Sequence, residues 1–277
     1  MPEAGIAVLF DVDDTLVDFA GAARAALADV VLAALGADAG TGSATGSAPD
    51  RTADRDLLEA AHRAWQHVSE REYSRFTAGE LDFDQMRLSR MSAFLRTIDR
   101  PGARRLDHEL LEHRRNEAIF GHFRVFDDVP PALRRLRAAG IAVHVLSNSD
   151  GAYQRAKLAA VGLGELAADG FYSGELGVAK PDPRIFRLAA SRLGRAPGEL
   201  VYVGDRWDVD VLGSAAAGLR PVWLDRQGTG PGPVPVPESV RGPEVPAAAG
   251  PVIRIGTLDE LVVDSHGLHL GGRGPGR

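Results

Sequence analysis

Apolar residues follow two different spacings along this chain. Five successive residues, Ile6–Phe10, carry no polar side chain, which is typical of a strand buried on both faces of a sheet. After Val17 the apolar residues recur every three or four positions, so we expect a helix from about Ala20 to Leu35. The helical spacing continues through residues 54–123 without a convincing strand, and this stretch predicts three helices.

From Phe126 onward, short apolar runs alternate with helical segments. The predicted strands are Ile141–Leu146, a short one near Phe171–Tyr172, Leu200–Val203 and Pro221–Leu224. A repeated order of strand, loop and helix predicts an α/β fold with a doubly wound, Rossmann-like parallel sheet. Residues 252–263 are expected to add one more strand and a short helix, and the glycine-rich tail after His266 is expected to fray.

These patterns predict a division into domains. Residues 1–17 and 125–277 are expected to form the Rossmann-like core, and residues 18–124 a separate helical lobe. Because the lobe is inserted directly after the first strand, we expect it to act as a lid; the alternative is that its helices simply pack on the sheet. Residues 40–49 are small and polar, and residues 228–251 are rich in Gly and Pro, so both stretches are predicted to be loops.

Composition narrows the class of protein. Of the 277 residues, 44% are hydrophobic and 25% are charged, as in ordinary globular proteins. No apolar run is long enough to span a membrane and the start lacks the features of a signal peptide, so we expect a cytoplasmic protein. Independently of these features, a monomer or a homodimer is expected. The absence of cysteine excludes disulfides and thiolate chemistry. A net charge of −6 gives no support for nucleic-acid binding.

Polar side chains occur in a fixed order at or near the carboxyl ends of the predicted strands. They are Asp11 and Asp13, Ser147 with Asn148, Lys180, and Asp205 with Asp210. Each alone has a plain structural explanation, such as a turn, a helix cap or a surface lysine. Because the loops at one edge of a parallel sheet converge, we expect these side chains to lie together. Asp11 and Asp13 would repel each other without a partner, which indicates a bound hard cation.

This ordered set resembles the four motifs of the haloacid dehalogenase (HAD) superfamily. The first motif reads Asp11-Val12-Asp13-Asp14-Thr15-Leu16-Val17, and the whole set covers roughly residues 6–224. One departure is Asp14, since many relatives carry glycine at this position. The helical lobe lies between the first two motifs, which resembles the subfamily that carries an α-helical cap at this point.

The resemblance implies a Mg²⁺-dependent phosphatase that acts on a small phosphorylated metabolite. In such enzymes Asp11 attacks phosphorus to form an aspartyl-phosphate, while Asp13 protonates the leaving oxygen and later deprotonates a water molecule. Ser147, together with the backbone amide of Asn148, holds a phosphoryl oxygen of the substrate. Lys180 balances the charge on that oxygen and on Asp11.

The resemblance also implies a set of metal ligands. Asp11 offers a carboxylate oxygen, Asp13 a backbone carbonyl, and Asp205 is the third protein ligand. Ligation by oxygen alone suits magnesium. Asp210 is expected to bind a metal-bound water or to orient the lysine, because its spacing of five from Asp205 resembles the family pattern. The competing residue Asp208 is then expected to cap the following helix.

Two other interpretations stay open, a phosphomutase and an idle binding domain, whereas dehalogenation is disfavoured. Haloacid dehalogenases lack an acid at the position of Asp13, so its presence argues for phosphoryl transfer. A phosphomutase of the same superfamily shares the first motif. A catalytically idle HAD-like domain that binds a ligand or a protein would normally have lost Asp11, Asp13 or Lys180, all of which are present.

Side chains of the helical lobe give weaker signals. Its histidines are expected on solvated helix faces rather than in a metal site: His62, His67, His108 and His113. Candidates for substrate specificity are Phe19, Arg71, Arg75, Arg114 and Arg115.

Overall fold

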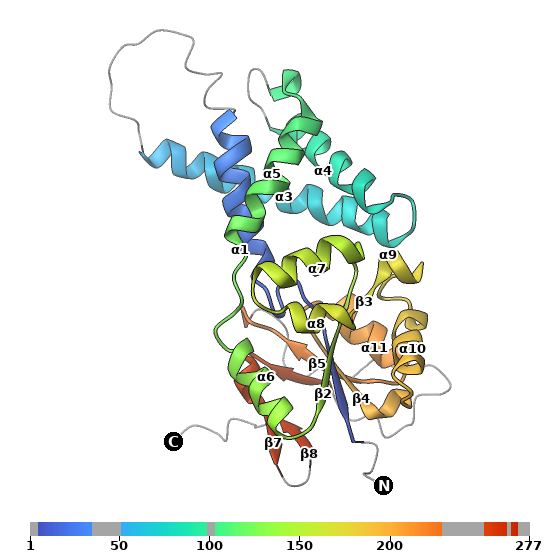
Figure 1. Cartoon of the computed structure of the whole chain (residues 1–277). Helices are drawn as coiled ribbons and strands as arrows, with labels where there is room; N and C mark the ends of the chain where they lie inside the picture. Colours follow the sequence, from blue (N-terminus) through green and yellow to red (C-terminus); the bar gives the residue numbers. More distant parts are fainter. Residues whose placement is uncertain (1–4, 35–50, 99–102, 229–251, 265–266, 271–277) are drawn as a thin grey trace. The chain divides into compact units, whose positions relative to one another are not determined.

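The computed structural model describes residues 5–34, 51–98, 103–228, 252–264 and 267–270. The chain divides into two compact units, one formed by Phe19–Phe123 and the other by residues 1–18 and 124–277 (Figure 1). The expected loop at 40–49, and all of the one at 228–251 except Gly228, fall outside the described ranges. Within those ranges, each helix is too short or too polar to cross a membrane.

A six-stranded parallel sheet forms the centre of the unit made of residues 1–18 and 124–277, with the strand order β3-β2-β1-β4-β5-β6. Its strands are β1 (Ala7–Phe10), β2 (Ala142–Ser147), β3 (Phe171–Tyr172), β4 (Leu200–Gly204), β5 (Arg220–Leu224) and β6 (Ile253–Ile255). This topology confirms the predicted α/β fold. The strand that carries the first motif, β1, lies between the strands that precede the second and fourth motifs.

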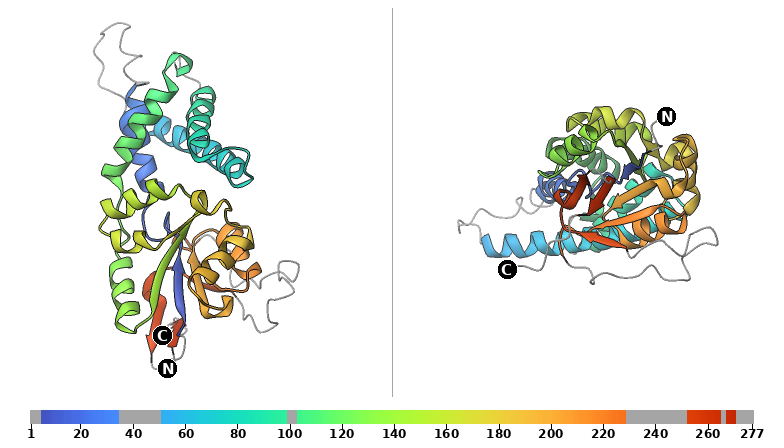
Figure 2. Two further views of the ribbon diagram at one scale, coloured as in Figure 1. Left: turned by 45° about the vertical axis from the view of Figure 1, so that its right-hand side comes forward. Right: turned by 90° about the horizontal axis from the view of Figure 1, so that it is seen from below.

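Helices flank the sheet on both faces (Figures 1 and 2). They are α6 (Val129–Ala138), α7 (Gly151–Ala160), α8 (Gly164–Ala168), α9 (Ser173–Leu176), α10 (Pro183–Arg192) and α11 (Leu212–Ala216). A π-helical turn, Trp207–Val211, precedes α11, and a 3₁₀ turn, Pro197–Glu199, precedes β4. Ile185 and Phe186 of α10 share one buried cluster with Ala7 and Leu9 of β1. Every residue of β1 is buried, since alternate side chains face opposite helical layers.

The C-terminal part of this unit differs from expectation. The predicted strand and short helix correspond to β6 and to a 3₁₀ turn, Leu258–Glu260. A two-stranded antiparallel hairpin follows, in which β7 (Leu261–Asp264) pairs with β8 (Gly267–Leu270). The expected fraying after His266 is therefore wrong for residues 267–270, because their backbone groups pair with β7.

The described residues of the unit Phe19–Phe123 form helices and the short turns between them. It contains α1 (Phe19–Ala26), which continues as a π-helical turn (Leu27–Leu32), then α3 (Arg51–Thr77), α4 (Phe83–Thr97), a 3₁₀ turn (Ala103–Arg105) and α5 (His108–His122). Trp65 and Phe94 pack edge to face at the centre of its core, with 5.1 Å between ring centroids. Whether this unit acts as a cap stays a prediction.

Charged groups are buried inside the helical unit. Glu112 accepts hydrogen bonds from Nε and Nη2 of Arg115 at 2.8 and 2.7 Å and lies within ion-pair distance of Arg87 and Arg90. Burial alone would raise the pKa of Glu112, but the three arginines lower it to about 2. The Arg90 and Arg115 guanidinium groups also lie over the Trp65 ring, at 4.9 and 5.1 Å from its centroid.

One histidine of this unit differs from expectation. His62 is buried, with its Nε2 3.3 Å from the carbonyl oxygen of Arg24, and burial lowers its pKa. The expected solvated position is therefore wrong for His62, because it shares the inward face of α3 with Trp65, three residues further on. His67 and His113 are exposed.

The sheet unit ties together the two points at which the helical segment is inserted. Asp18 N–H donates to the carbonyl of Arg124 at 2.9 Å, and Val17 forms an antiparallel bridge with Val125. The chain therefore leaves the sheet unit and returns to it at adjacent backbone positions.

Candidate active site

The end of β1 places Asp11 beside β4. The Asp11 N–H donates to the carbonyl of Val203 at 2.9 Å, which extends the strand pairing by one residue beyond Phe10. The Asp11 side chain is buried at the carboxyl edge of the sheet. An apolar strand that ends directly in aspartate thus delivers a carboxylate to the edge where ligands bind in open α/β sheets.

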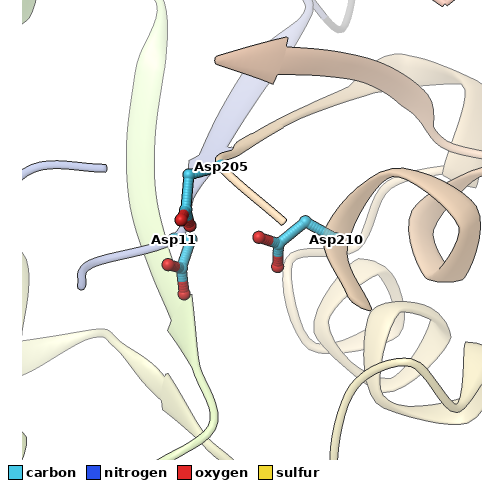
Figure 3. A group of neighbouring side chains, drawn as sticks. All are labelled: Asp11, Asp205 and Asp210. Carbon is cyan, nitrogen blue, oxygen red and sulfur yellow. The ribbon is translucent and has the colours of Figure 1, made fainter. Parts of the chain in front are cut away.

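Three carboxylates converge at this edge. Asp11, Asp205 and Asp210 each offer an oxygen, and these oxygens all lie within 4.8 Å of one another (Figure 3). Burial and the neighbouring negative charges raise the pKa of Asp205 to about 9. Burial likewise raises the pKa of Asp11 to about 7, although Lys180 opposes the change. Carboxylates that are costly to ionise together favour a bound cation, and this oxygen-only donor set fits Mg²⁺.

A buried lysine links two of these acids. Nζ of Lys180 donates to Oδ1 of Asp11 at 2.6 Å and to Oδ1 of Asp210 at 2.7 Å. It also donates to Oη of Tyr202 on β4 at 2.9 Å, and the Tyr202 hydroxyl lies 3.1 Å from the carbonyl oxygen of Leu146. Tyr202 did not emerge from the sequence, because a tyrosine within an apolar strand resembles a packing residue.

The end of β2 holds the lysine loop by its backbone. Nδ2 of Asn148 donates to the carbonyl of Lys180, and Oδ1 of Asn148 accepts from the Lys180 N–H, both at 2.7 Å. The sequence predicts a role only for the backbone amide of Asn148, and it does not predict that the Asn148 side chain holds the Lys180 backbone. Ser147 is buried, and its hydroxyl accepts a hydrogen bond from Nε2 of Gln154 at 3.1 Å.

Asp13 is not part of the group formed by Asp11, Asp205 and Asp210. Its carboxylate forms an ion pair with Lys157 instead of Lys180. Oδ1 of Asp13 accepts from Nζ of Lys157 on α7 at 2.5 Å. The next residue, Asp14, has a left-handed backbone with φ of 60°. Glycine adopts this conformation without strain, which explains why glycine is common at this position and why aspartate, which tolerates it, is an acceptable substitute.

The Gly-Asp sequence of the fourth motif reflects a close approach. A Cβ atom on Gly204 would lie 2.5 Å from Cγ of Asp210, so any side chain there would displace that carboxylate. Oδ2 of Asp210 accepts the Arg206 N–H at 3.0 Å, at the start of the π-helical turn. Asp208 is exposed and lies 3.3 Å from the Arg206 guanidinium. The expectation that Asp208 caps this helix is therefore wrong, because Asp210 takes the backbone N–H.

The fold and these side chains define an α/β enzyme with an acidic, lysine-containing centre at the carboxyl edge of its sheet. The model of the haloacid dehalogenase-like hydrolases matches residues 7–218. The chain belongs to this family of hydrolases.

Some known proteins resemble part of this sequence, and others share its fold. The phosphoserine phosphatase of Thermus thermophilus is 38% identical over 148 residues, which are 52% of this chain and 54% of that protein. The glyceraldehyde 3-phosphate phosphatase of Methanopyrus kandleri is 37% identical over 111 residues, 40% of this chain and 48% of that protein. The chain thus spans about half the length of these relatives. The crystal structure of a dehalogenase, 23% identical, shares the fold with a TM-score of 0.65 and covers 94% of this chain and 96% of its own.

Proposed function

We propose that this protein is a Mg²⁺-dependent phosphatase that hydrolyses a small phosphorylated metabolite through an aspartyl-phosphate. The contact of Lys180 with both Asp11 and Asp210, beside the third carboxylate of Asp205, carries the proposal. A phosphate monoester resists attack because its anionic oxygens repel the nucleophile, so a site must supply cations and hold the attacker in line. The phosphatase names of the two relatives support this class of reaction.

The residues divide the chemistry into two steps. An oxygen of Asp11 attacks phosphorus, the bond to the leaving oxygen breaks, and Asp13 gives that oxygen a proton. Water then attacks the aspartyl-phosphate, Asp13 takes the proton, and inorganic phosphate leaves with Asp11 restored. Lys180 and the Ser147 hydroxyl stabilise the phosphoryl oxygens during both steps.

The metal role rests on the donor set. Asp11, Asp205 and Asp210 would hold Mg²⁺ directly or through a water, together with the backbone carbonyl of Asp13. Bound Mg²⁺ supplies positive charge that offsets the phosphoryl oxygens. The acid at position 13 favours phosphoryl transfer over dehalogenation, since only the former needs a proton on the leaving oxygen.

A phosphate-release assay tests the proposal. Wild-type protein with Mg²⁺ is expected to release phosphate from para-nitrophenyl phosphate and from members of a panel of phosphorylated sugars, nucleotides and glycolytic acids. EDTA or Asp11→Asn should abolish release, whereas Asp208→Asn, the same change at an exposed acid, should leave it unchanged. The absence of Mg²⁺-dependent release from every substrate contradicts the proposal, and an isomerised product without free phosphate indicates a phosphomutase.

A further inference from the structure

Lys157 is a buried lysine that the proposed reaction does not use. It lies on α7, its side chain is 0% exposed, and its Nζ contacts Asp13, which is 144 residues away in sequence. The Asp13 side chain is 31% exposed. The Lys157 side chain is therefore the fully buried member of the ion pair, whereas the Asp13 carboxylate remains partly accessible to solvent.

Burial of this lysine is not explained by stability alone. A lysine near a surface usually extends its ammonium into water, whereas Lys157 directs it inward. Desolvation of an ammonium often cancels the gain from its ion pair, so a buried pair is weak support for a purely stabilising role. The Tyr153 ring, with its centroid 5.0 Å from Nζ of Lys157, further confines the ammonium.

The same face of α7 contacts a second residue of the proposed machinery. Gln154 and Lys157 are three residues apart, about one helical turn, and so lie on one side of the helix. Gln154 donates to the Ser147 hydroxyl, while Lys157 donates to Asp13. One helix face thus fixes side chains that arrive from the ends of two different strands, β1 and β2.

We propose that Lys157 is a positioning residue that holds the Asp13 carboxylate where it exchanges protons with the leaving oxygen and with water. This inference rests on the proposed phosphatase function. Without the ammonium, the Asp13 side chain loses its fixed partner and samples other rotamers. Proton delivery to the leaving group then becomes slower, while attack by Asp11 is less affected.

Leaving groups of different basicity test this role. The variant Lys157→Met removes the ammonium and keeps an unbranched side chain. We expect its kcat/KM to fall roughly 100-fold for β-glycerophosphate and by no more than about threefold for para-nitrophenyl phosphate, whose leaving phenolate needs no proton. The parameter kcat/KM is chosen because it reports the steps up to departure of the leaving group. Lys157→Arg should restore part of the activity toward β-glycerophosphate.

Controls separate positioning from folding. Arg155→Met removes a partly exposed basic residue of the same helix, whose partner is Glu175 and not Asp13, and should leave both rates unchanged. Crystal structures of wild-type protein and Lys157→Met should show the Asp13 carboxylate displaced in the variant, a readout that needs no activity. Equal losses on both substrates, or an unmoved Asp13, overturn the inference. If the wild type releases phosphate from neither of these substrates nor from any member of the panel, the proposed function is overturned instead, and the structures still judge the position of Asp13.

Discussion

The side-chain amide of Asn148 hydrogen-bonds both the N–H and the carbonyl of Lys180, each at 2.7 Å. The loop after β2 therefore fixes the backbone of the lysine, while Asp11 and Asp210 fix its ammonium. Three loops from different parts of the chain converge on one residue. Its position depends on all of them at once.

Asn148→Ala removes both backbone contacts and should lower kcat about tenfold and the free energy of unfolding by about 2 kcal/mol, since each hydrogen bond contributes about 1 kcal/mol. Asn148→Asp keeps the acceptor for the Lys180 N–H and loses the donor, so an intermediate kcat is expected. Phosphate-release kinetics and urea denaturation measure the two effects. Full activity of Asn148→Ala would show that the lysine is held by its side-chain contacts alone.

Gly204→Ala should displace the Asp210 carboxylate, because the added Cβ would overlap it. We expect a loss of roughly 100-fold in kcat/KM, as misplacement of a group by about 1 Å can cause. Gly198→Ala is the matched control, since a Cβ there meets no atom within 4 Å. Similar rates for both variants would mean that Asp210 can shift without consequence.

Mg²⁺ should raise the melting temperature more at pH 8 than at pH 6. The pKa values of Asp11 and Asp205 are raised to about 7 and about 9, so the folded metal-free protein binds more protons than the unfolded chain above about pH 4. Its stability then falls as pH rises toward these values, and the cation compensates for the charge that develops. Thermal melts with Mg²⁺ and with EDTA, at equal ionic strength, give the rise in melting temperature caused by Mg²⁺ at each pH. Equal increments at both pH values would contradict a site built on these carboxylates.

Glu112→Gln should destabilise the helical unit by about 3 kcal/mol, because it leaves buried arginines without their carboxylate. The pKa of Glu112 is about 2, below its ordinary value of 4.5, so its stabilising effect is complete above about pH 4.5 and declines as pH falls toward 2. Urea denaturation should therefore show a smaller difference from the wild type at pH 3 than at pH 7. Glu109→Gln, at an exposed position of the same helix, should have little effect at either pH. A difference that does not depend on pH would assign the loss to packing.

The sheet and the gathering of polar groups at its edge were predictable because the signals are local. An apolar run followed at once by Asp11 or by Asp205 reveals both the strand and the end at which the carboxylate lies. The strand order then brings the two loops together, since β1 and β4 are neighbours. The catalytic and metal-binding roles of these residues stay predictions.

Other features depend on contacts that the local pattern does not reveal. Lys157 resembles a solvated helical lysine, and Tyr202 a packing residue, until the partners from distant segments are known. His62 had a usable signal, because it lies three residues before Trp65 and so on the same helix face. The alternation Gly-Leu-His-Leu at 267–270 likewise indicates a strand, although the surrounding glycines obscure it.

Because the Asp18 N–H donates to the Arg124 carbonyl, the inserted segment of about a hundred residues has the same effect on the backbone of the sheet unit as a tight turn. A graft of different length or architecture between the same two anchor points would leave the register of β1 untouched. Changes in the sequence and length of the inserted segment therefore disturb the sheet less than changes elsewhere. Insertions and deletions in the helical segment can therefore accumulate without disturbing the side chains at the carboxyl edge of the sheet.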